Sequence, residues 1–589
     1  MDATNANPDQ NTSDTAHVQF SKPPACRVGV NKEPSILGSI ISVLTGKSAV
    51  PFVPCIPSKD ELDTAAQHGN FGTQRPSELF LQIYLNVLKA IGESVLMETS
   101  NSIVAASGTV PLTIISTVPD IADHYYNLII EATAEIIIFS NFWKFSYAAR
   151  RIGDALRMLS RKAGQTKEPR IAVKIMFDRG SIKHILYSRV IITEPEWVAL
   201  GLPPSKEIPN IDLEVLNYHN FPLGTLHSKF MVIDKKVAIL NSCNIQDNSN
   251  LEMMCQFEGP IVNEIWGHAI ATWGVPTDLN ILSANESSSA LESDYENISR
   301  ADPLLDSEGL VNVPSIKHTL KDITEVLNRS VKNRYPSNLV DGEAPEPLFY
   351  SHSRLNTPSV PMFLAPRAPY AGFGNYSINT PQNIAWLSAI YFAKSKIFIQ
   401  TPDLNAEPVV TALLEAVKRG IEVKIILCLG YNDLGEMLPT QGGHNEWVVA
   451  RMKEQLNEVD KKRLKIYWYV GRDMVKPVHA LKHFRTCHIK LMIVDGRIGI
   501  QGSGNQDSQS WFHSQEVNMV IDSEKISKVW MEQLGCNQNS MIYGLGSEVD
   551  GIWRDYLRNQ VPGSIGPEPG PGAWVRAVVG LLKSALGYK

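Results

Sequence analysis

Residues 487–505 read CHIKLMIVDGRIGIQGSGN, and this stretch decides the fold because the chain contains its pattern twice. Residues 226–244 read LHSKFMVIDKKVAILNSCN, which shares the pattern H-x-K-x4-D-x6-[GN]-S-x-N at an offset of 261 residues, from 227 to 488. Two upstream segments, EIIIFSNFWKFS from Glu135 and KIFIQTPDLNAE from Lys396, have the same offset. Because both pairs of segments are separated by the same 261 residues, we predict that the chain contains an internal duplication.

Each copy predicts the same local structure. The apolar runs on either side of the repeated aspartate read as two strands, and Asp495-Gly496 predicts a tight turn between them. Upstream, each half has a strand, a helical pattern and another strand: ALRMLSRKAG then RIAVKIMFD, and ALLEAVKRG then IEVKIILCL. This succession favours a mainly parallel sheet covered by helices in each half. We therefore expect an α/β fold made of two repeated domains.

The polar residues of the repeated pattern predict a phosphate site. Residues i and i+2 of a strand share a face, so each histidine projects together with its lysine. Imidazole, ammonium, hydroxyl and amide groups suit a tetrahedral oxyanion, whereas zinc or magnesium needs converging carboxylates or several His and Cys ligands. We expect no metal and no cofactor. The predicted catalytic residues are His227, Lys229, Asp234, His488, Lys490 and Asp495, and the predicted phosphate-binding residues are Ser242, Asn244, Ser503 and Asn505.

Two histidines allow two chemical roles, because one imidazole can attack phosphorus while the other donates a proton to a leaving oxygen. Glu252 lies 25 residues after His227, and Glu516 lies 28 residues after His488. Either glutamate could return to hold an imidazole tautomer, as the acid of a catalytic triad does.

Other polar residues near the motifs have simpler interpretations. Asp234 and Asp495 stand at predicted turns, so a structural role is as well supported as a chemical one. His219 and His483 are expected to be ordinary surface or packing histidines.

The composition is that of a soluble globular protein. The 589 residues are 43% hydrophobic and 20% charged, and a prior of ~150 residues per domain suggests two to four units. The net charge of −6 gives no overall attraction to nucleic acid. Seven cysteines without paired spacing favour a reducing compartment, and the acidic N-terminus does not read as a signal peptide. We expect an intracellular protein, cytoplasmic or peripheral to a membrane, without a transmembrane helix.

The chain divides into five predicted segments: a polar tail and lead-in (1–60), a first half (61–275), an acidic linker (276–350), a second half (351–560), and a Gly/Pro spacer with an amphipathic helix (561–589). Residues 573–589 could lie in a membrane interface, since apolar residues share one helix face and Arg576 and Lys583 are basic. Docking on the protein's own surface is the alternative. We expect a monomer.

The repeated pattern resembles the paired HKD motifs of the phospholipase D superfamily, over roughly residues 120–275 and 375–530. The resemblance implies a bilobal pseudo-dimer in which both motifs build one metal-free site. It implies that His227 forms a phosphohistidine, that His488 acts as acid and base, and that the lysines and asparagines hold phosphoryl oxygens. Asn241 stands where the second motif has Gly502; asparagine would tolerate a left-handed backbone there.

By this resemblance the protein is a phosphodiesterase or phosphatidyltransferase acting on glycerophospholipids. The acceptor would be water, as in a phospholipase D, or an alcohol such as phosphatidylglycerol, as in a cardiolipin synthase. A nuclease of the same superfamily and a catalytically silent membrane-associated scaffold are the alternatives. Nucleic acid is not the expected partner, because the chain is acidic and has no runs of Lys and Arg.

Overall fold

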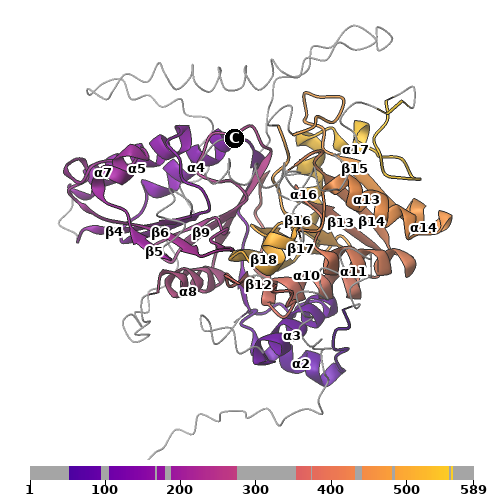
Figure 1. The fold of residues 1–589 in the computed structure, drawn as a ribbon. Helices are drawn as coiled ribbons and strands as arrows, with labels where there is room; N and C mark the ends of the chain where they lie inside the picture. The colour runs from indigo at the N-terminus through magenta and orange to yellow at the C-terminus, as the bar shows by residue number, and fades with distance from the viewer. Residues whose placement is uncertain are drawn as a thin grey trace, which may run out of the picture.

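The computed structural model of the protein describes residues 52–93, 105–165, 169–178, 188–274, 353–372, 374–431, 441–480, 485–555 and 559–560. The predictions for the N-terminal tail, the acidic linker and the C-terminal helix fall outside these residues. The described part has an α/β fold, with two sheets flanked by helices (Figure 1). Among its helices none is both long and apolar enough to cross a membrane.

The first sheet is formed mainly by the first half of the chain. Its strands, in spatial order, are β11 (Ser353–Arg354), β2 (Leu112–Ser116), β10 (Glu252–Glu258), β9 (Val237–Asn241), β8 (Phe230–Ile233), β3 (Glu135–Ser140), β4 (Ile171–Phe177), β6 (Ile211–Asn220) and β5 (Arg189–Ile191), with β7 (Gly224–Thr225) paired to β6.

The second sheet repeats this arrangement. Its strands, in order, are β1 (Ala106–Gly108), β12 (Val360–Arg367), β18 (Glu516–Asp522), β17 (Ile498–Gly502), β16 (Leu491–Val494), β13 (Lys396–Gln400), β14 (Glu422–Leu427) and β15 (Leu464–Trp468). Both predicted hairpins are present, as β8–β9 and β16–β17. The duplication is therefore visible in the order of the strands.

Three helices of the first half have counterparts in the second. The first half contains α4 (Val118–Ile129), α5 (Tyr147–Ala163), α7 (Glu194–Ala199) and α8 (Ile261–Trp273). The second half contains α10 (Pro381–Phe392), α11 (Glu407–Lys418), α13 (Asn445–Glu454), α14 (Glu458–Arg463), α15 (Ser508–Phe512), α16 (Glu524–Asn537) and α17 (Ser540–Tyr543), and the N-terminal region adds α2 (Lys59–His68) and α3 (Glu78–Glu93). Helix α4 corresponds to α10, α5 to α11 and α8 to α16.

The prediction of mainly parallel sheets is wrong in detail, although the α/β class is confirmed. Parallel pairing is confined to β3–β4–β6 and β13–β14–β15, and the other described neighbours pair antiparallel. The long apolar runs suggested parallel strands because they indicate burial of both faces. Here the same burial arises because each sheet packs between helices and the other sheet.

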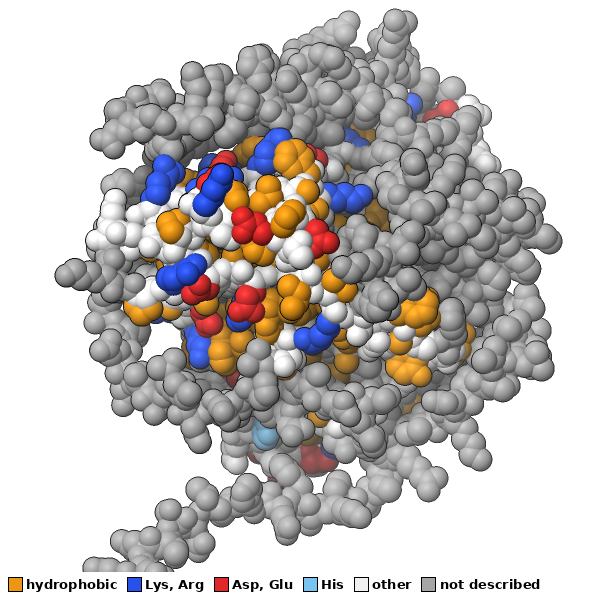
Figure 2. Space-filling model, turned by 60° about the vertical axis from the view of Figure 1, so that its left-hand side comes forward, with side chains coloured by type: hydrophobic (Ala, Val, Ile, Leu, Met, Phe, Trp, Pro, Cys, Tyr) orange, Lys and Arg blue, Asp and Glu red, His pale blue; other side chains and the backbone are white. Residues whose placement is uncertain are grey.

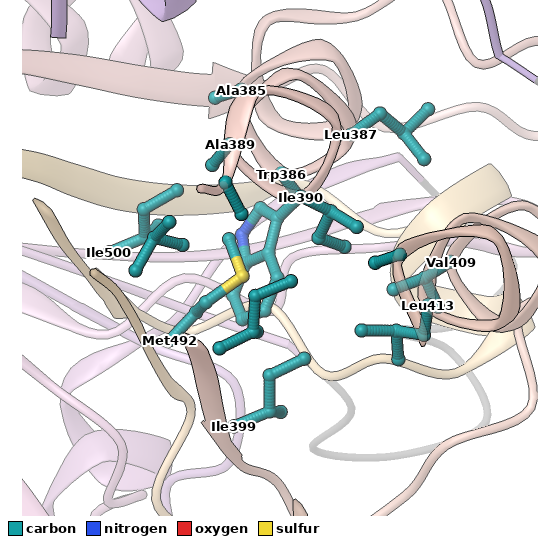
Figure 3. Packing of buried hydrophobic residues seen from close by; sticks show 14 of the residues in the cluster. Ala385, Trp386, Leu387, Ala389, Ile390, Ile399, Val409, Leu413, Met492 and Ile500 are labelled. Atoms are coloured by element: carbon teal, nitrogen blue, oxygen red, sulfur yellow. The ribbon is translucent and has the colours of Figure 1, made fainter. Parts of the chain in front are cut away.

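Alternate residues of the central strands belong to different cores. On β16, Leu491 and Ile493 pack between the two sheets, whereas Met492 and Val494 pack under the helices. Figure 3 shows the second environment: Trp386 and Ile390 of α10 point from the helix toward Met492. Each fully buried large apolar side chain contributes roughly 1.5–3 kcal/mol. The two-sided burial fixes the strand register, because a slip of one residue would exchange the faces.

The two halves also exchange short segments. Strand β1, from the first half, pairs with β12 in the second sheet, and β11, from the second half, pairs with β2 in the first. Helix α3 lies next to α10 and α2 lies next to α3 (Figure 1), and Phe80 and Tyr84 of α3 share a core with Phe363. Residues 59–93 thus pack on the second half, although the sequence placed 61–275 in the first.

Candidate active site

Both histidine motifs lie where the two halves meet. Each motif histidine precedes the hairpin of its own motif, and the backbone around it is joined to the opposite half by a pair of hydrogen bonds. The amide of His227 donates to the carbonyl oxygen of Gln515 at 2.9 Å, and the amide of His488 donates to that of Leu251 at 2.8 Å. Parallel bridges at Leu226–Gln515 and Leu251–Cys487 complete this symmetric junction. Gln515 and Leu251 each immediately precede one of the glutamates singled out in the sequence.

The histidines and glutamates pair across the halves. His227 Nδ1 lies 2.7 Å from Glu516 Oε1, and His488 Nδ1 lies 3.1 Å from both carboxylate oxygens of Glu252. The sequence predicted that these glutamates orient the histidines, without assigning each glutamate to one imidazole. Each carboxylate fixes the imidazole of the other motif, which leaves Nε2 as the nitrogen available for chemistry. Neither half contains a complete pair alone.

The serines of the motifs bind these glutamates. Ser242 Oγ donates to Glu252 Oε2 at 2.5 Å, and Ser503 Oγ donates to Glu516 Oε2 at 2.6 Å. Both hydroxyl oxygens also accept a backbone amide hydrogen, from Met253 and from Val517. The serines were predicted to bind phosphate. The structure instead places them behind the glutamates, which they hold in place.

The two asparagines differ in their surroundings. Asn505 Nδ2 donates to Asp507 Oδ2 at 2.8 Å, and Asp507 Oδ1 accepts the amide hydrogen of Ser510 at 2.6 Å. The side-chain oxygens of Asn244 and Asn505 are buried without a hydrogen-bond partner among the described residues. Asp507 therefore fixes the second asparagine, a contact that the repeated pattern does not predict because the aspartate lies just beyond it.

The two lysines are fully buried at the junction. Lys229 Nζ donates to the carbonyl oxygen of His227, and Lys490 Nζ donates to that of His488 at 2.6 Å. Burial lowers the pKa of Lys229 to about 7, and it lowers the pKa of Lys490 as well. An ammonium has three hydrogens, so each lysine retains donors for an anion. A bound anion would favour the charged form of both side chains.

The two aspartates are structural. The Asp234 carboxylate accepts backbone amide hydrogens of Thr133, Ala134 and Glu135, at 2.7–2.8 Å. Asp495 accepts the amide hydrogens of residues 394–396 in the second half. Each aspartate lies in the turn after the first hairpin strand, whereas the histidine precedes that strand. The carboxylates thus tie the hairpins to β3 and β13 at the end opposite the histidines, and the predicted catalytic role is replaced by anchoring.

The turns explain why these anchors are aspartates. Asp234, Lys235 and Asp495 have positive φ angles of 51–54°, and Gly496 has one of 69°. Aspartate is one of the few residues with a side chain that enters this left-handed region readily. The same residue can therefore form the turn and accept the amide hydrogens.

The two imidazoles differ in how far their pKa is lowered. Burial lowers the pKa of His227 well below 6.5, and the charges of Lys229 and Lys490 lower it further. Burial also lowers the pKa of His488, but the Glu252 carboxylate opposes that shift. His227 is therefore the more strongly neutral of the two, which is the state of an attacking nitrogen.

The pKa values of the two glutamates also differ between the halves. Burial raises the pKa of Glu516 to about 7, although the charge of Lys229 opposes this. Burial also acts upward on Glu252, but the charge and hydrogen bond of His488 hold its pKa below 4.5. The Glu252 carboxylate thus keeps its negative charge at neutral pH, and this charge opposes the effect of burial on the pKa of His488. The two halves are similar in geometry and unequal in electrostatics.

A second histidine supports the first motif from behind. His219 Nδ1 lies 3.0 Å from both oxygens of Asp178, and one of these oxygens accepts the amide hydrogen of Leu226. Both side chains are buried. His219 is thus a packing residue, as expected from the sequence, and it stabilises the backbone next to His227. The corresponding contact in the second half is made by Cys428, whose sulfur accepts the amide hydrogen of Cys487.

The difference between Asn241 and Gly502 has a steric cause. Neither residue has a positive φ, so the suggested left-handed conformation is not the reason. A Cβ on Gly502 would lie 2.2 Å from the carbonyl oxygen of Val517 and 2.6 Å from Asn518 Cα. In the first half, Asn241 Nδ2 donates to the hydroxyl of Tyr125 at 2.8 Å. The first hairpin accommodates a side chain where the second does not.

Sequence reasoning missed Tyr431. Its ring lies against the imidazole of His488, with centroids 6.1 Å apart and planes inclined by 33°. The residue follows β14, and the first half shows no counterpart among the described residues because 179–187 lie outside them. A position outside the repeated pattern gives no signal in a search for repeats.

The described residues contain no group of three or more His, Cys, Asp or Glu side chains arranged to hold a metal ion. They contain two imidazoles whose Nδ1 atoms face glutamates, two buried lysine side chains, and the asparagine amides at one junction. Such a donor set fits a phosphate oxyanion.

Comparison with known proteins agrees with the duplicated motif. A family described as "Cardiolipin synthase, PLD-like domain" matches residues 387–535, which contain the whole second motif. The cardiolipin synthase of Clostridium perfringens is 32% identical over 160 residues, and cardiolipin synthase A of Buchnera aphidicola is 30% identical over 159. Residues 387–535 are therefore similar to the phospholipase D-like domain of cardiolipin synthases. The matched segments span 28% and 27% of those two relatives.

Solved structures of superfamily members are more distant in sequence. The phosphatidylserine synthase of Haemophilus influenzae is 12% identical, with a TM-score of 0.46 over 82% of this chain and 96% of that one. Nuc of Salmonella typhimurium, a phospholipase D family member, is 18% identical, with a TM-score of 0.21 over 31% of this chain and 95% of that one.

Proposed function

We propose that this protein transfers phosphatidyl groups between alcohols by way of a phosphohistidine. The observation that carries the proposal is the crossed pairing of His227 with Glu516 and of His488 with Glu252. It orients two imidazoles at one junction, each with Nδ1 occupied and Nε2 available. Two buried lysines accompany them.

In the first step, His227 Nε2 attacks the phosphorus of a glycerophospholipid. The N–P bond forms as the P–O bond to the head-group alcohol breaks, and His488 gives its Nε2 proton to the departing oxygen. His227 suits the attacking role because burial and the two lysine charges hold its pKa well below 6.5. His488 suits the acid role because the Glu252 carboxylate favours its protonated form.

In the second step, His488 takes the proton of the incoming alcohol. Its oxygen attacks phosphorus, and the N–P bond to His227 breaks, so both histidines return to their starting states. Lys229, Lys490 and the two asparagine amides would stabilise the charge on the phosphoryl oxygens in both transition states. The lysines are effective because little water competes for them in a buried site.

An alcohol is the acceptor we favour over water, because the matched relatives are named cardiolipin synthases. A lipid is the substrate we favour over nucleic acid. In Figure 2, the described surface on the side of α5 and α7 intersperses Lys and Arg with Asp, Glu and hydrophobic side chains, without a continuous basic stripe. A stripe of that kind is the usual footprint of a nucleic-acid-binding protein.

Product analysis tests the proposal. Purified full-length protein is incubated with vesicles of phosphatidylglycerol and phosphatidylethanolamine, with glycerol and single-stranded DNA present, and all products are followed by mass spectrometry. We expect a new phosphatidyl ester. Phosphatidic acid as the sole lipid product would indicate hydrolysis, and cut DNA with unchanged lipid would establish the nuclease alternative.

Two variants separate a catalyst from a scaffold. His227→Ala and His488→Ala should each reduce product formation by at least a thousandfold, because residues that act together in one step are each indispensable. Thermal unfolding of both variants serves as the folding control. Full activity in either variant would refute the assignment of that histidine.

A further inference from the structure

One aromatic side chain lies against His488. The Tyr431 ring lies 6.1 Å from the His488 imidazole, measured between centroids. Tyr431 is therefore on the side of the site on which, under the proposed function, alcohols leave and enter.

The charges of three acidic side chains act on the hydroxyl of Tyr431. Burial raises its pKa well above 10, and the charges of Asp403, Glu252 and Asp507 act in the same direction. Glu252 binds His488 and Asp507 binds Asn505, so the phenol belongs to the same constellation as the histidine motif. The hydroxyl consequently stays protonated at neutral pH and is available as a hydrogen-bond donor.

The halves differ in sequence at Asp403. The duplication register places it opposite Phe142 of the first half, 261 residues earlier. Asp403 is buried, and its charge acts on Lys490 as well as on Tyr431. The His488 side is therefore polar and acidic where the corresponding position on the His227 side is aromatic. An acidic environment disfavours an anionic group and favours hydroxyl hydrogens.

We propose that Tyr431 selects the acceptor, by donating its phenolic hydrogen to the second hydroxyl of a neutral vicinal diol whose first hydroxyl meets His488. This inference rests on the proposed function, since it assigns the acceptor to the His488 side. In the transfer step the first hydroxyl forms the new O–P bond and gives its proton to His488. The second hydroxyl is not consumed and serves only for recognition. Glycerol and glycerol-headed lipids have this diol, whereas water and simple monoalcohols do not.

A competition assay tests the selection. Full-length wild-type protein and Tyr431→Phe are given phosphatidylethanolamine vesicles with equal concentrations of glycerol and 1-propanol, and the two phosphatidyl esters and phosphatidic acid are quantified. The variant removes one hydroxyl and keeps the ring. We expect the glycerol-to-propanol product ratio to fall about five- to tenfold, the range of a single hydrogen bond, while total lipid consumption changes less than the ratio.

Tyr370→Phe is the matched control. Tyr370 also lies against a histidine, His513, at 6.5 Å, but neither belongs to the repeated motifs. Its product ratio should equal that of the wild type. Asp403→Asn provides a second test that leaves Tyr431 intact, and it should lower the glycerol-to-propanol ratio in the same direction.

The outcomes separate the two proposals. An unchanged ratio in both Tyr431→Phe and Asp403→Asn, with phosphatidyl esters still formed, would overturn the acceptor selection alone. Failure of the wild type to form any phosphatidyl product would overturn the proposed function and this inference together.

Discussion

Replacing Glu252 by glutamine should impair the chemistry of His488, a residue of the other motif. Both Glu252 oxygens lie 3.1 Å from His488 Nδ1, and the carboxylate is fully buried. A hydrogen bond to a charged group contributes about 1.5–3 kcal/mol. The value of kcat/KM should therefore fall about 10- to 150-fold.

The pH dependence identifies which histidine is affected. His488 acts as an acid and must be protonated, so activity is lost as pH rises through its pKa. Glu252 raises that pKa, and its removal must move the alkaline limb of the kcat/KM profile to lower pH. A loss of 1.5–3 kcal/mol corresponds to a shift of roughly one to two pH units.

Glu516→Gln should lower activity without moving the alkaline limb, because Glu516 binds His227. Glu264→Gln is the matched control: burial raises the pKa of Glu264 to about 7, like that of Glu516, but this residue lies on α8 outside the motifs. The profile of this control should equal that of the wild type. If Glu516→Gln moved the alkaline limb and Glu252→Gln did not, the crossed pairing would be refuted.

Three further variants test the supporting structure. Asp495→Asn should lower the free energy of unfolding by about 1–3 kcal/mol, measured by denaturant titration, and should leave kcat unchanged. Because the folded-state pKa of Asp495 is lowered, its contribution to stability should disappear as pH falls below about 4. Gly502→Ala should lower the free energy of unfolding by about 1–3 kcal/mol, because its Cβ would lie 2.2 Å from the Val517 carbonyl oxygen. The control Gly535→Ala, in open space on α16, should raise the free energy of unfolding by about 0.5–1 kcal/mol. A loss of stability in both variants would contradict the steric explanation. Lys490→Met should reduce kcat at least a hundredfold, because it removes a buried donor for the phosphoryl oxygens; a retained kcat would exclude a role in phosphoryl binding.

The duplication and its hairpins could be predicted from sequence because they depend on local patterns. Apolar runs around an aspartate define the strands, and the constant register between the halves links them. The direction of the remaining strands could not be predicted. Burial of both faces looks the same in sequence whether it results from parallel βαβ units or from two sheets packed together.

The sequence predicted the repeated histidines and the two glutamates of the site, but not which of them pair. His227 and His488 stand in the pattern and come together at the junction of the halves, but the choice of glutamate partner depends on tertiary structure. Glu252 lies closer in sequence to His227 and binds His488. Tyr431 lies outside the pattern, and Asp234 lies within it for a structural reason. A spacing pattern identifies which residues matter together, but it does not separate anchors from reacting groups.

Covalent trapping tests most directly whether one site is built from both motifs. His488→Ala is mixed with an aryl phosphodiester, whose leaving group departs without a proton, and the protein is quenched in alkali and mapped by mass spectrometry. We expect one phosphoryl group per chain on the peptide that contains His227, and none in His227→Ala. A phosphoryl group on any other residue, or turnover by His488→Ala without an adduct, would contradict the division of roles between the two histidines.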